Sequence, residues 1–216
     1  MIRKAIFDLD GTLIDTSEGI IESVKYAVQK MNYPGLNNDE LVNFIGPPLK
    51  DSFLRYLVKN EVEAEIAVRY FREYYANGGL LKAKPYDGIC GLLELLSERN
   101  VNLSVATYKL EKYAIKMLKF FKIDSYFKSI HGSDADGRMK KKEIVQLCLD
   151  DMSEALDEAV LIGDTSNDEK AAEELGMSFL AVTYGFGYRS PEKVNYRNCI
   201  GVADCPLKIG EIIMES

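Results

Sequence analysis

The chain has 216 residues, of which 47% are hydrophobic and 28% are charged, a composition typical of a soluble protein with one large domain or two small ones. Its formal net charge is −7, and an acidic chain repels nucleic-acid phosphates, so we expect no nucleic-acid partner. One histidine and four cysteines without CxxC spacing argue against a zinc site. They favour reduced thiols in the cytoplasm, and we recognise neither a secretory leader nor a membrane-spanning run.

An apolar run opens the chain. Residues 2–8 predict a buried strand that leads into Asp8-Leu9-Asp10-Gly11-Thr12. Because strand side chains alternate between faces, Asp8 and Asp10 should project the same way. Two carboxylates this close are costly unless a cation lies between them. The segment therefore predicts a charged site at the end of the first strand.

A helical block follows this strand. Apolar residues recur at helical spacing over residues 17–32, 38–45, 49–60 and 62–76. Gly46-Pro47-Pro48 interrupts the block, and Lys84-Pro85 marks its end. No convincing strand lies within it, so we expect residues 16–83 to form an inserted helical domain.

Strands and helices alternate in the rest of the chain. Strands are predicted over residues 101–106, 126–130, 159–162 and 178–183. Helices are predicted over residues 89–99, 110–121, 141–151, 168–175 and 206–214. This alternation indicates an α/β fold with a doubly wound parallel, Rossmann-like sheet, formed by residues 1–15 and 84–216.

Polar residues follow several of the predicted strands. Thr107 comes after one strand, Asp164 and Asp168 come after another, and a run of lysines at 140–142 opens a helix. In doubly wound sheets ligands bind at the carboxyl ends of the strands, so these groups should converge with Asp8 and Asp10. Carboxylate, carbonyl and water oxygens suit Mg²⁺. The sequence therefore predicts a Mg²⁺ site beside an anion-binding site.

These motifs resemble those of a known family. Asp8-Leu9-Asp10-Gly11-Thr12, Thr107, a lysine at 140–142 and Gly163-Asp164 with Asp168 are similar, in order and spacing, to the four motifs of the haloacid dehalogenase-like hydrolases. The helical insertion resembles the small C1-type cap of the phosphoglycolate-phosphatase-like branch. The resemblance extends over nearly the whole chain.

The resemblance implies catalytic roles for two residues. Asp8 would attack phosphorus and become an aspartyl-phosphate. Asp10 would protonate the leaving oxygen and then deprotonate the hydrolytic water. Mg²⁺ would be held by Asp8, Asp164 and the backbone carbonyl of Asp10. Asp168 would assist by binding the metal directly, by binding it through water, or by orienting a neighbour.

The resemblance also implies phosphate-binding residues. Thr107 and Tyr108 would contact the phosphoryl group, although Tyr108 departs from the serine common at this position in the branch. A lysine would neutralise the phosphoryl group and Asp8. In the family this lysine lies three residues before an apolar pair, which favours Lys141 over Lys140 and Lys142.

Substrate specificity would come largely from the cap. Gly46 and Pro47 resemble a cap segment common in the branch and are candidates for contacting the leaving group. Lys109 is another candidate, which would contact substrate, pair with an acidic neighbour or have a purely structural role.

The resemblance implies a Mg²⁺-dependent phosphatase that acts on a small phosphorylated metabolite, as a monomer or a homodimer. Phosphoglycolate, a nucleotide, a sugar phosphate and pyrophosphate all remain possible substrates. A β-phosphoglucomutase-type isomerase is the alternative, but residues 40–60 lack the basic cap segment of those mutases. A carbon–halogen hydrolase lacks the second aspartate, which Asp10 supplies here. A non-enzymatic Mg²⁺-binding protein is disfavoured because no motif residue is missing.

Overall fold

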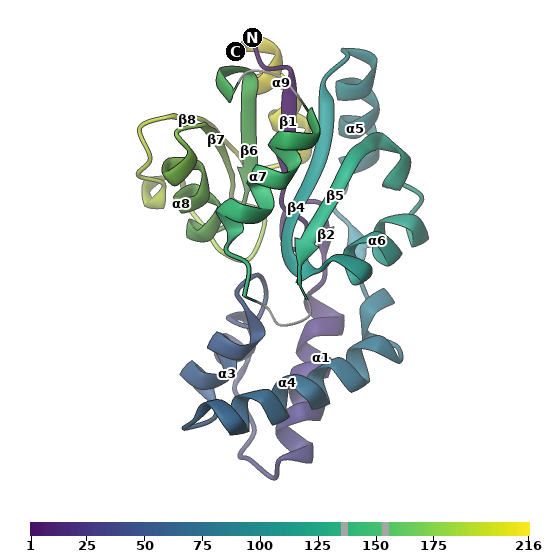
Figure 1. Ribbon diagram of the computed structural model, residues 1–216, viewed down its shortest axis with the longest axis vertical. Helices are drawn as coiled ribbons and strands as arrows, with labels where there is room; N and C mark the ends of the chain where they lie inside the picture. The colour runs from purple at the N-terminus through teal and green to yellow at the C-terminus, as the bar shows by residue number, and fades with distance from the viewer. Residues whose placement is uncertain (135–137, 153–155) are drawn as a thin grey trace. The chain divides into compact units, whose positions relative to one another are not determined.

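The computed structural model describes residues 1–134, 138–152 and 156–216 and divides the chain into two compact units (Figure 1). One unit comprises Met1–Ile14 and Pro85–Ser216, and the other comprises Asp15–Lys84. The two connecting segments, Ile14–Asp15 (β2) and Lys84–Pro85 (β3), pair as a short two-stranded sheet.

The larger unit is built on a parallel sheet with the strand order β5-β4-β1-β6-β7-β8. Its strands are β1 (Lys4–Phe7), β4 (Asn102–Leu110), β5 (Phe127–Ser133), β6 (Ala159–Gly163), β7 (Ser178–Val182) and β8 (Cys199–Ala203). The predicted doubly wound α/β sheet is confirmed.

Strand β1 lies at the centre of this sheet. Phe7 pairs with Val105 of β4 on one side and with Ile162 of β6 on the other. Ala5, Ile6 and Phe7 are completely buried, as an apolar run in a doubly covered parallel strand should be. The carboxyl ends of β1, β4 and β6 therefore meet at one edge, where the chain crosses from one side of β1 to the other.

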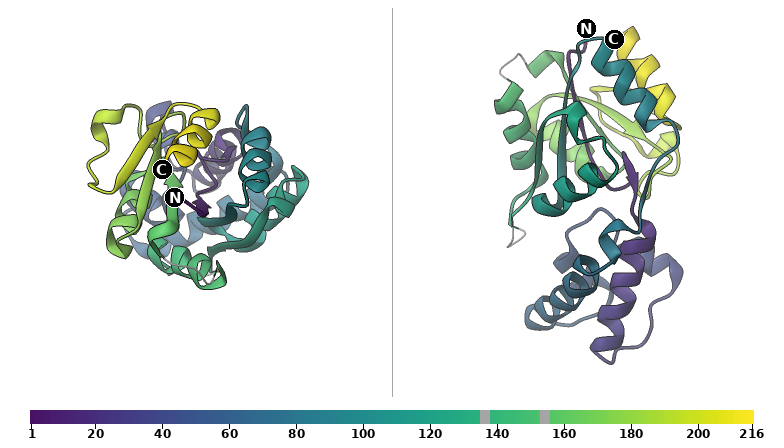
Figure 2. Two further views of the ribbon diagram at one scale, coloured as in Figure 1. Left: turned by 90° about the horizontal axis from the view of Figure 1, so that it is seen from above. Right: turned by 90° about the vertical axis from the view of Figure 1, so that its right-hand side faces the viewer.

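Helices cover both faces of the sheet. They are α5 (Ile89–Glu98), α6 (Glu111–Phe120), α7 (Lys141–Met152), α8 (Ser166–Leu175) and α9 (Pro206–Glu215). Helices α7 and α8 pack together on one face, while α5 and α9 lie side by side on the other (Figure 2). Short 3-10 turns occur at Gly79–Leu81, Asp124–Tyr126, Leu156–Glu158 and Pro191–Lys193.

The smaller unit is helical. Its helices are α1 (Ser17–Lys30), α2 (Asn38–Val42), α3 (Leu49–Tyr56) and α4 (Glu61–Ala76). Helix α4 packs against α1 and α3 around buried aromatic side chains such as Phe53 and Phe71. The side chains of Asn37 and Asn60 accept hydrogen bonds from the first turns of α2 and α4, which fixes where these helices begin.

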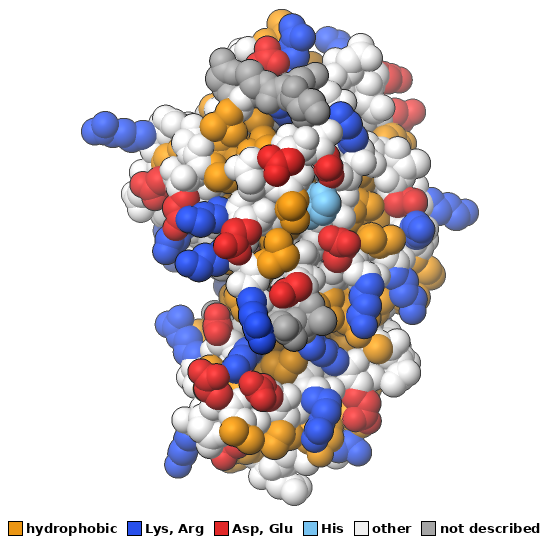
Figure 3. All heavy atoms as spheres, in the orientation of Figure 1, with side chains coloured by type: hydrophobic (Ala, Val, Ile, Leu, Met, Phe, Trp, Pro, Cys, Tyr) orange, Lys and Arg blue, Asp and Glu red, His pale blue; other side chains and the backbone are white. Residues whose placement is uncertain are grey.

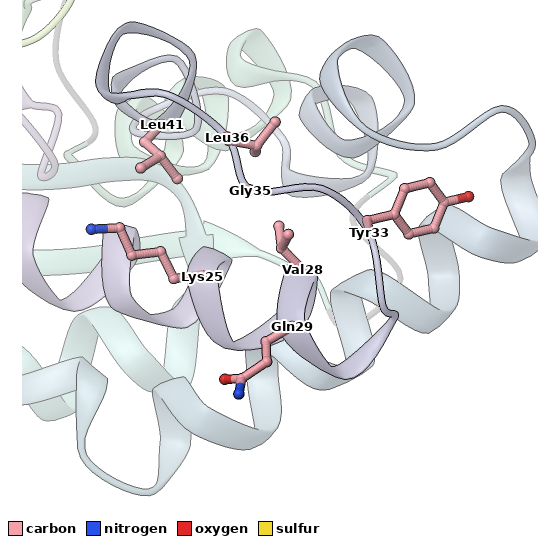
Figure 4. A pocket seen from close by; sticks show the side chains of 7 residues that line it. All are labelled: Lys25, Val28, Gln29, Tyr33, Gly35, Leu36 and Leu41. Atoms are coloured by element: carbon pink, nitrogen blue, oxygen red, sulfur yellow. The ribbon is translucent and has the colours of Figure 1, made fainter.

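A pocket of about 380 Å³ lies in the helical unit, between α1 and the segment that leads into α2 (Figure 4). Its lining includes the apolar side chains of Val28, Leu36 and Leu41, together with Lys25 and Gln29. None of the predicted site residues is among those that line it.

Several elements differ from the prediction, and β4 and β8 are the ones that bear on the sheet. Strand β4 continues to Leu110, well beyond residue 106, because Thr107 and Leu110 still pair with β5. Strand β8 was not predicted, and its short sequence contains Gly201, which weakens a strand pattern.

The surface and the helix lengths bear on possible partners. On the face drawn in Figure 3, acidic and basic side chains are interspersed. Among the described residues, no helix combines the length and the apolar character needed to span a bilayer.

Candidate active site

Asp8 and Asp10 follow β1 directly, and a tight turn holds them. The Asp8 amide donates to the Ile162 carbonyl of β6 at 2.8 Å, so the sheet ladder extends into the site. The Leu9 carbonyl accepts from the amides of both Leu13 and Ile14 at 3.0 Å, which folds the chain back after Asp10. Asp8 is 4% exposed and Asp10 is 6% exposed. Both carboxylates are therefore nearly removed from water and depend on the protein for compensation.

Lys141, the first residue of α7, supplies much of that compensation. Its Nζ lies 2.7 Å from Oδ1 of Asp8 and 2.7 Å from Oδ1 of Asp168. Of the other two candidate lysines, Lys140 is exposed, and the Nζ of Lys142 lies 3.1 Å from Glu174. The geometry therefore favours Lys141 as the lysine of the site.

The cluster shifts the pKa values of its members. Burial raises the pKa of the Asp8 carboxyl to about 7; Lys141 opposes this shift, while Asp168 and Asp10 add to it. Burial alone lowers the pKa of the Lys141 ammonium, but the charges of Asp168 and Asp8 outweigh it and raise the pKa above its ordinary value. Lys141 therefore stays protonated beside a carboxyl group whose pKa is raised to about 7.

Asp164 directly follows β6 and is completely buried. Its Oδ2 accepts hydrogen bonds from the amides of Phe186 and Gly187 at 2.7 and 3.1 Å. Its Oδ1 has no hydrogen-bond partner among the described residues. Burial, and then the charges of Asp8 and Asp168, raise the pKa of Asp164 to about 8 despite the two amide donors.

This cluster fits a divalent cation. One carboxylate oxygen from each of Asp8, Asp164 and Asp168 can be chosen so that all lie within 4.8 Å of one another. An unpartnered buried oxygen on Asp164 is costly unless a cation binds it. The donors are all oxygens, as Mg²⁺ requires, so the residues present fit that ion.

Both carboxylate oxygens of Asp168 already face other groups of the protein. As the third residue of α8 it forms a capping box, in which its Oδ2 accepts from the Thr165 hydroxyl at 2.6 Å and the Thr165 amide at 3.2 Å. Its Oδ1 faces Lys141. Of the roles left open by the sequence, orienting a neighbour therefore agrees best with these contacts, and that neighbour is Lys141.

Thr107, Tyr108 and Lys109 follow one another in β4, and each makes a different contact. Thr107 is buried, and its hydroxyl accepts from the Lys109 amide at 3.1 Å, which leaves its own proton to donate. The Lys109 ammonium lies 2.7 and 3.0 Å from the two carboxylate oxygens of Asp10. The Tyr108 hydroxyl accepts from the Lys141 amide at 3.0 Å. The expected phosphate contact of Tyr108 stays a prediction, and the contact present supports α7.

A model of the haloacid dehalogenase-like hydrolase family matches residues 5–182, which includes every residue of this cluster. The chain belongs to the haloacid dehalogenase-like hydrolases. The resemblance predicted from the four motifs is thus confirmed at the level of the family.

Relatives of this hydrolase have several names. A 5′-nucleotidase from Pseudomonas aeruginosa is 38% identical over 183 residues, which cover 84% of this chain and 83% of that protein. Tyrosine-protein kinase PtkA from Mycobacterium tuberculosis is 34% identical over 186 residues, 86% of this chain but 63% of the kinase. The crystal structure of a predicted phosphatase from Clostridium acetobutylicum superposes with a TM-score of 0.92 at 34% identity and covers both chains completely.

The loop that follows β7 was not predicted to take part in the chemistry of the site. In the structure of the hydrolase, the Phe186 and Gly187 amides bind Asp164, and the Tyr188 amide donates to the Asp164 carbonyl at 2.7 Å. A Cβ at Gly185 would lie 2.3 Å from the Gly11 carbonyl oxygen. The Gly-Phe-Gly sequence after a predicted strand was the available signal, since glycine marks close backbone approach.

Gly46 and Pro47 belong to the helical unit, where they lie in the segment between α2 and α3. The other predicted site residues all belong to the α/β unit and lie at the carboxyl edge of its sheet. The specificity role of Gly46 and Pro47 stays a prediction.

Proposed function

We propose that this hydrolase is a Mg²⁺-dependent phosphatase that acts on a small phosphorylated metabolite through an aspartyl-phosphate on Asp8. The observation that carries the proposal is the contact between Asp8 and Lys141, at 2.7 Å in a buried site. A carboxylate held beside a permanent cation, next to an unpartnered Asp164 oxygen, suits an anionic electrophile.

In the first half-reaction an Asp8 oxygen attacks phosphorus and the ester P–O bond breaks. Asp10 donates its proton to the departing oxygen, which leaves as an alcohol. Lys141 and the Thr107 hydroxyl stabilise the phosphoryl oxygens as negative charge redistributes. When bound at Asp8 and Asp164, Mg²⁺ supplies further neutralisation of the phosphoryl charge.

In the second half-reaction Asp10, now a carboxylate, takes a proton from water. The water oxygen attacks phosphorus, the bond between phosphorus and Asp8 breaks, and inorganic phosphate leaves. Asp8 regains its carboxylate and Asp10 its proton, so the cycle closes. Splitting hydrolysis into two displacements makes each step easier than direct attack by water.

The acceptor in the second half-reaction separates this proposal from two phosphotransferase alternatives. A mutase would return the phosphoryl group to a sugar hydroxyl, and the relative named as a tyrosine kinase raises the question of a tyrosine acceptor. With ATP or a sugar phosphate as donor, we expect inorganic phosphate and no phosphorylated acceptor. Stoichiometric transfer to a sugar or to tyrosine would favour the alternatives.

The central test is the Asp8→Asn variant. It should lose Mg²⁺-dependent release of phosphate from p-nitrophenyl phosphate, while Asp150→Asn, at an exposed position of α7, should retain it. Circular dichroism of both variants checks folding. Full activity in the Asp8 variant would overturn the proposal.

The natural substrate needs a separate experiment. The value of kcat/KM is measured for nucleoside monophosphates, phosphoglycolate, sugar phosphates and pyrophosphate. We expect the compound with the highest value to belong to one of these four classes. Nucleoside monophosphates are the first to test, because the relative from Pseudomonas aeruginosa is named a 5′-nucleotidase.

A further inference from the structure

Lys109 pairs with Asp10 and has no role of its own in the two half-reactions. Its Nζ lies 2.7 Å from Oδ1 and 3.0 Å from Oδ2 of Asp10, so one ammonium spans both carboxylate oxygens. The side chains of Lys109 and Asp10 are 5% and 8% exposed. A buried ion pair of this kind holds Asp10 in place, because separating it would leave the Asp10 carboxylate without this cation in a site nearly removed from water.

The backbone explains why this lysine reaches Asp10. Strands β1 and β4 are parallel neighbours, and β4 continues beyond the last pair, Phe7 with Val105. Thr107 and Lys109 are two residues apart in that extension, where the pairing of β4 with β5 shifts register between Thr107 and Leu110. Thr107 in turn accepts a hydrogen bond from the Lys109 amide at 3.1 Å. Thus one strand, β4, supplies both a hydroxyl for the phosphoryl group and an ammonium for Asp10.

We propose that Lys109 is a positioning residue that holds the Asp10 carboxyl group in the place from which it transfers a proton to the leaving oxygen. The inference rests on the proposed function and adds a residue to it. Asp10 lies beyond the end of β1, and rotation about two side-chain bonds sets where its carboxyl group points. Spanning both of its oxygens restricts that rotation, and proton transfer depends strongly on such alignment.

Proton donation matters most when the leaving group is a strong base. The phenolate of phenyl phosphate needs a proton as the P–O bond breaks, whereas the p-nitrophenolate of p-nitrophenyl phosphate is stabilised by its nitro group and leaves without one. The parameter kcat/KM reports steps up to the first irreversible one, here cleavage of the ester bond. Comparing the two esters by kcat/KM therefore isolates the step in which Asp10 acts as an acid.

The test measures kcat/KM for both esters in wild type, Lys109→Met, Lys109→Gln and Lys109→Arg. We expect Lys109→Met to lose about 10²–10⁴-fold with phenyl phosphate, the usual worth of general acid catalysis, and less than about 10-fold with p-nitrophenyl phosphate. Asp10→Asn should show the same dependence on the leaving group. Lys109→Arg should recover part of the lost rate, because a guanidinium also pairs with both carboxylate oxygens.

Two controls keep the result interpretable. Lys116→Met makes the same change at an exposed position of α6 and should leave both rates unchanged. Lys109→Gln removes the charge but keeps a hydrogen-bond donor, and it replaces Lys109→Met in the test if the methionine variant does not fold. Equal losses with both esters, or no loss with either, would overturn the role of Lys109. If Asp8→Asn also stays active, the proposed function itself fails; if Asp8→Asn is inactive, only the inference about Lys109 fails.

Discussion

The Nζ of Lys141 lies 2.7 Å from Oδ1 of Asp8, and the two side chains are 3% and 6% exposed. The same ammonium lies 2.7 Å from Asp168, so one cation balances two buried carboxylates. This arrangement joins the first residue of α7, the end of β1 and the first turn of α8. The stability of the site and its chemistry therefore depend on the same ion-pair network.

The first prediction concerns this network. Lys141→Met should lower the free energy of unfolding by about 3–5 kcal/mol, because it leaves buried carboxylates without their cation. Phosphatase activity should fall by at least about 10²-fold, because an electrostatic stabiliser of the phosphoryl group is lost. Urea unfolding and kinetics with p-nitrophenyl phosphate measure the two effects.

Lys142→Met is the matched control for this prediction. The Lys142 side chain is 42% exposed and pairs with Glu174 at the surface, so its loss should cost less than about 1 kcal/mol and leave activity unchanged. If Lys142→Met were the more damaging change, the assignment of Lys141 would be wrong.

The second prediction concerns pH and metal. In the metal-free protein the pKa of Asp8 is raised to about 7 and that of Asp164 to about 8, mainly by burial. An aspartate in an unfolded chain has a pKa of about 3.9. Between about pH 4 and pH 8 the folded state therefore binds more protons than the unfolded state, so its stability falls as pH rises through this window. In EDTA the Tm should be higher at pH 5 than at pH 8.

Mg²⁺ should reverse much of this trend. The ion binds the charged carboxylates, so the rise in Tm on adding Mg²⁺ should be larger at pH 8 than at pH 5. Asp164→Asn removes one of the two raised groups and should flatten the pH dependence and reduce the Mg²⁺ effect. The comparison with wild type cancels contributions from distant titratable groups. Identical pH profiles in the two proteins would contradict the prediction.

The sequence predicted the framework of the site because that framework follows from local pattern. An apolar run before Asp8 and another before Asp164 indicated buried strands, and the carboxyl edge of a parallel sheet brought these aspartates together. For these strands the residue types and their periodicity carry the information. Lys141 was selected from the three lysines by the resemblance to the family, in which the lysine lies three residues before an apolar pair such as Ile144 and Val145.

Other features depend on geometry that no local pattern expresses. The amides of Phe186 and Gly187 bind Asp164 through the backbone, whose donors are the same in every residue. The pairing of Lys109 with Asp10 depends on the extension of β4 beyond the end of the predicted strand. Strand β8 was missed because it is short and contains Gly201.

The third prediction concerns Tyr108. Its hydroxyl accepts from the Lys141 amide at 3.0 Å, an amide at the start of α7 that has no helical partner. Tyr108→Phe keeps the ring and removes this acceptor, so the free energy of unfolding should fall by about 1 kcal/mol. The KM for p-nitrophenyl phosphate should change less than kcat, because Lys141 loses alignment rather than charge. A large rise in KM at unchanged kcat would instead indicate that the Tyr108 hydroxyl binds substrate.

The last prediction separates backbone strain from crowding of the metal site. Gly11 has a φ of +87°, and a Cβ there would lie 2.4 Å from Oδ2 of Asp164. Gly176 has a φ of +69°, but a Cβ there would meet no atom within 4 Å. Alanine at either position should cost about 1–2 kcal/mol through the left-handed backbone alone. Only Gly11→Ala should also displace Asp164, and it should therefore raise the Mg²⁺ concentration needed for half-maximal activity. Urea unfolding and Mg²⁺ titration of both variants measure these effects, and an unchanged Mg²⁺ requirement in Gly11→Ala would show that Asp164 does not hold the ion.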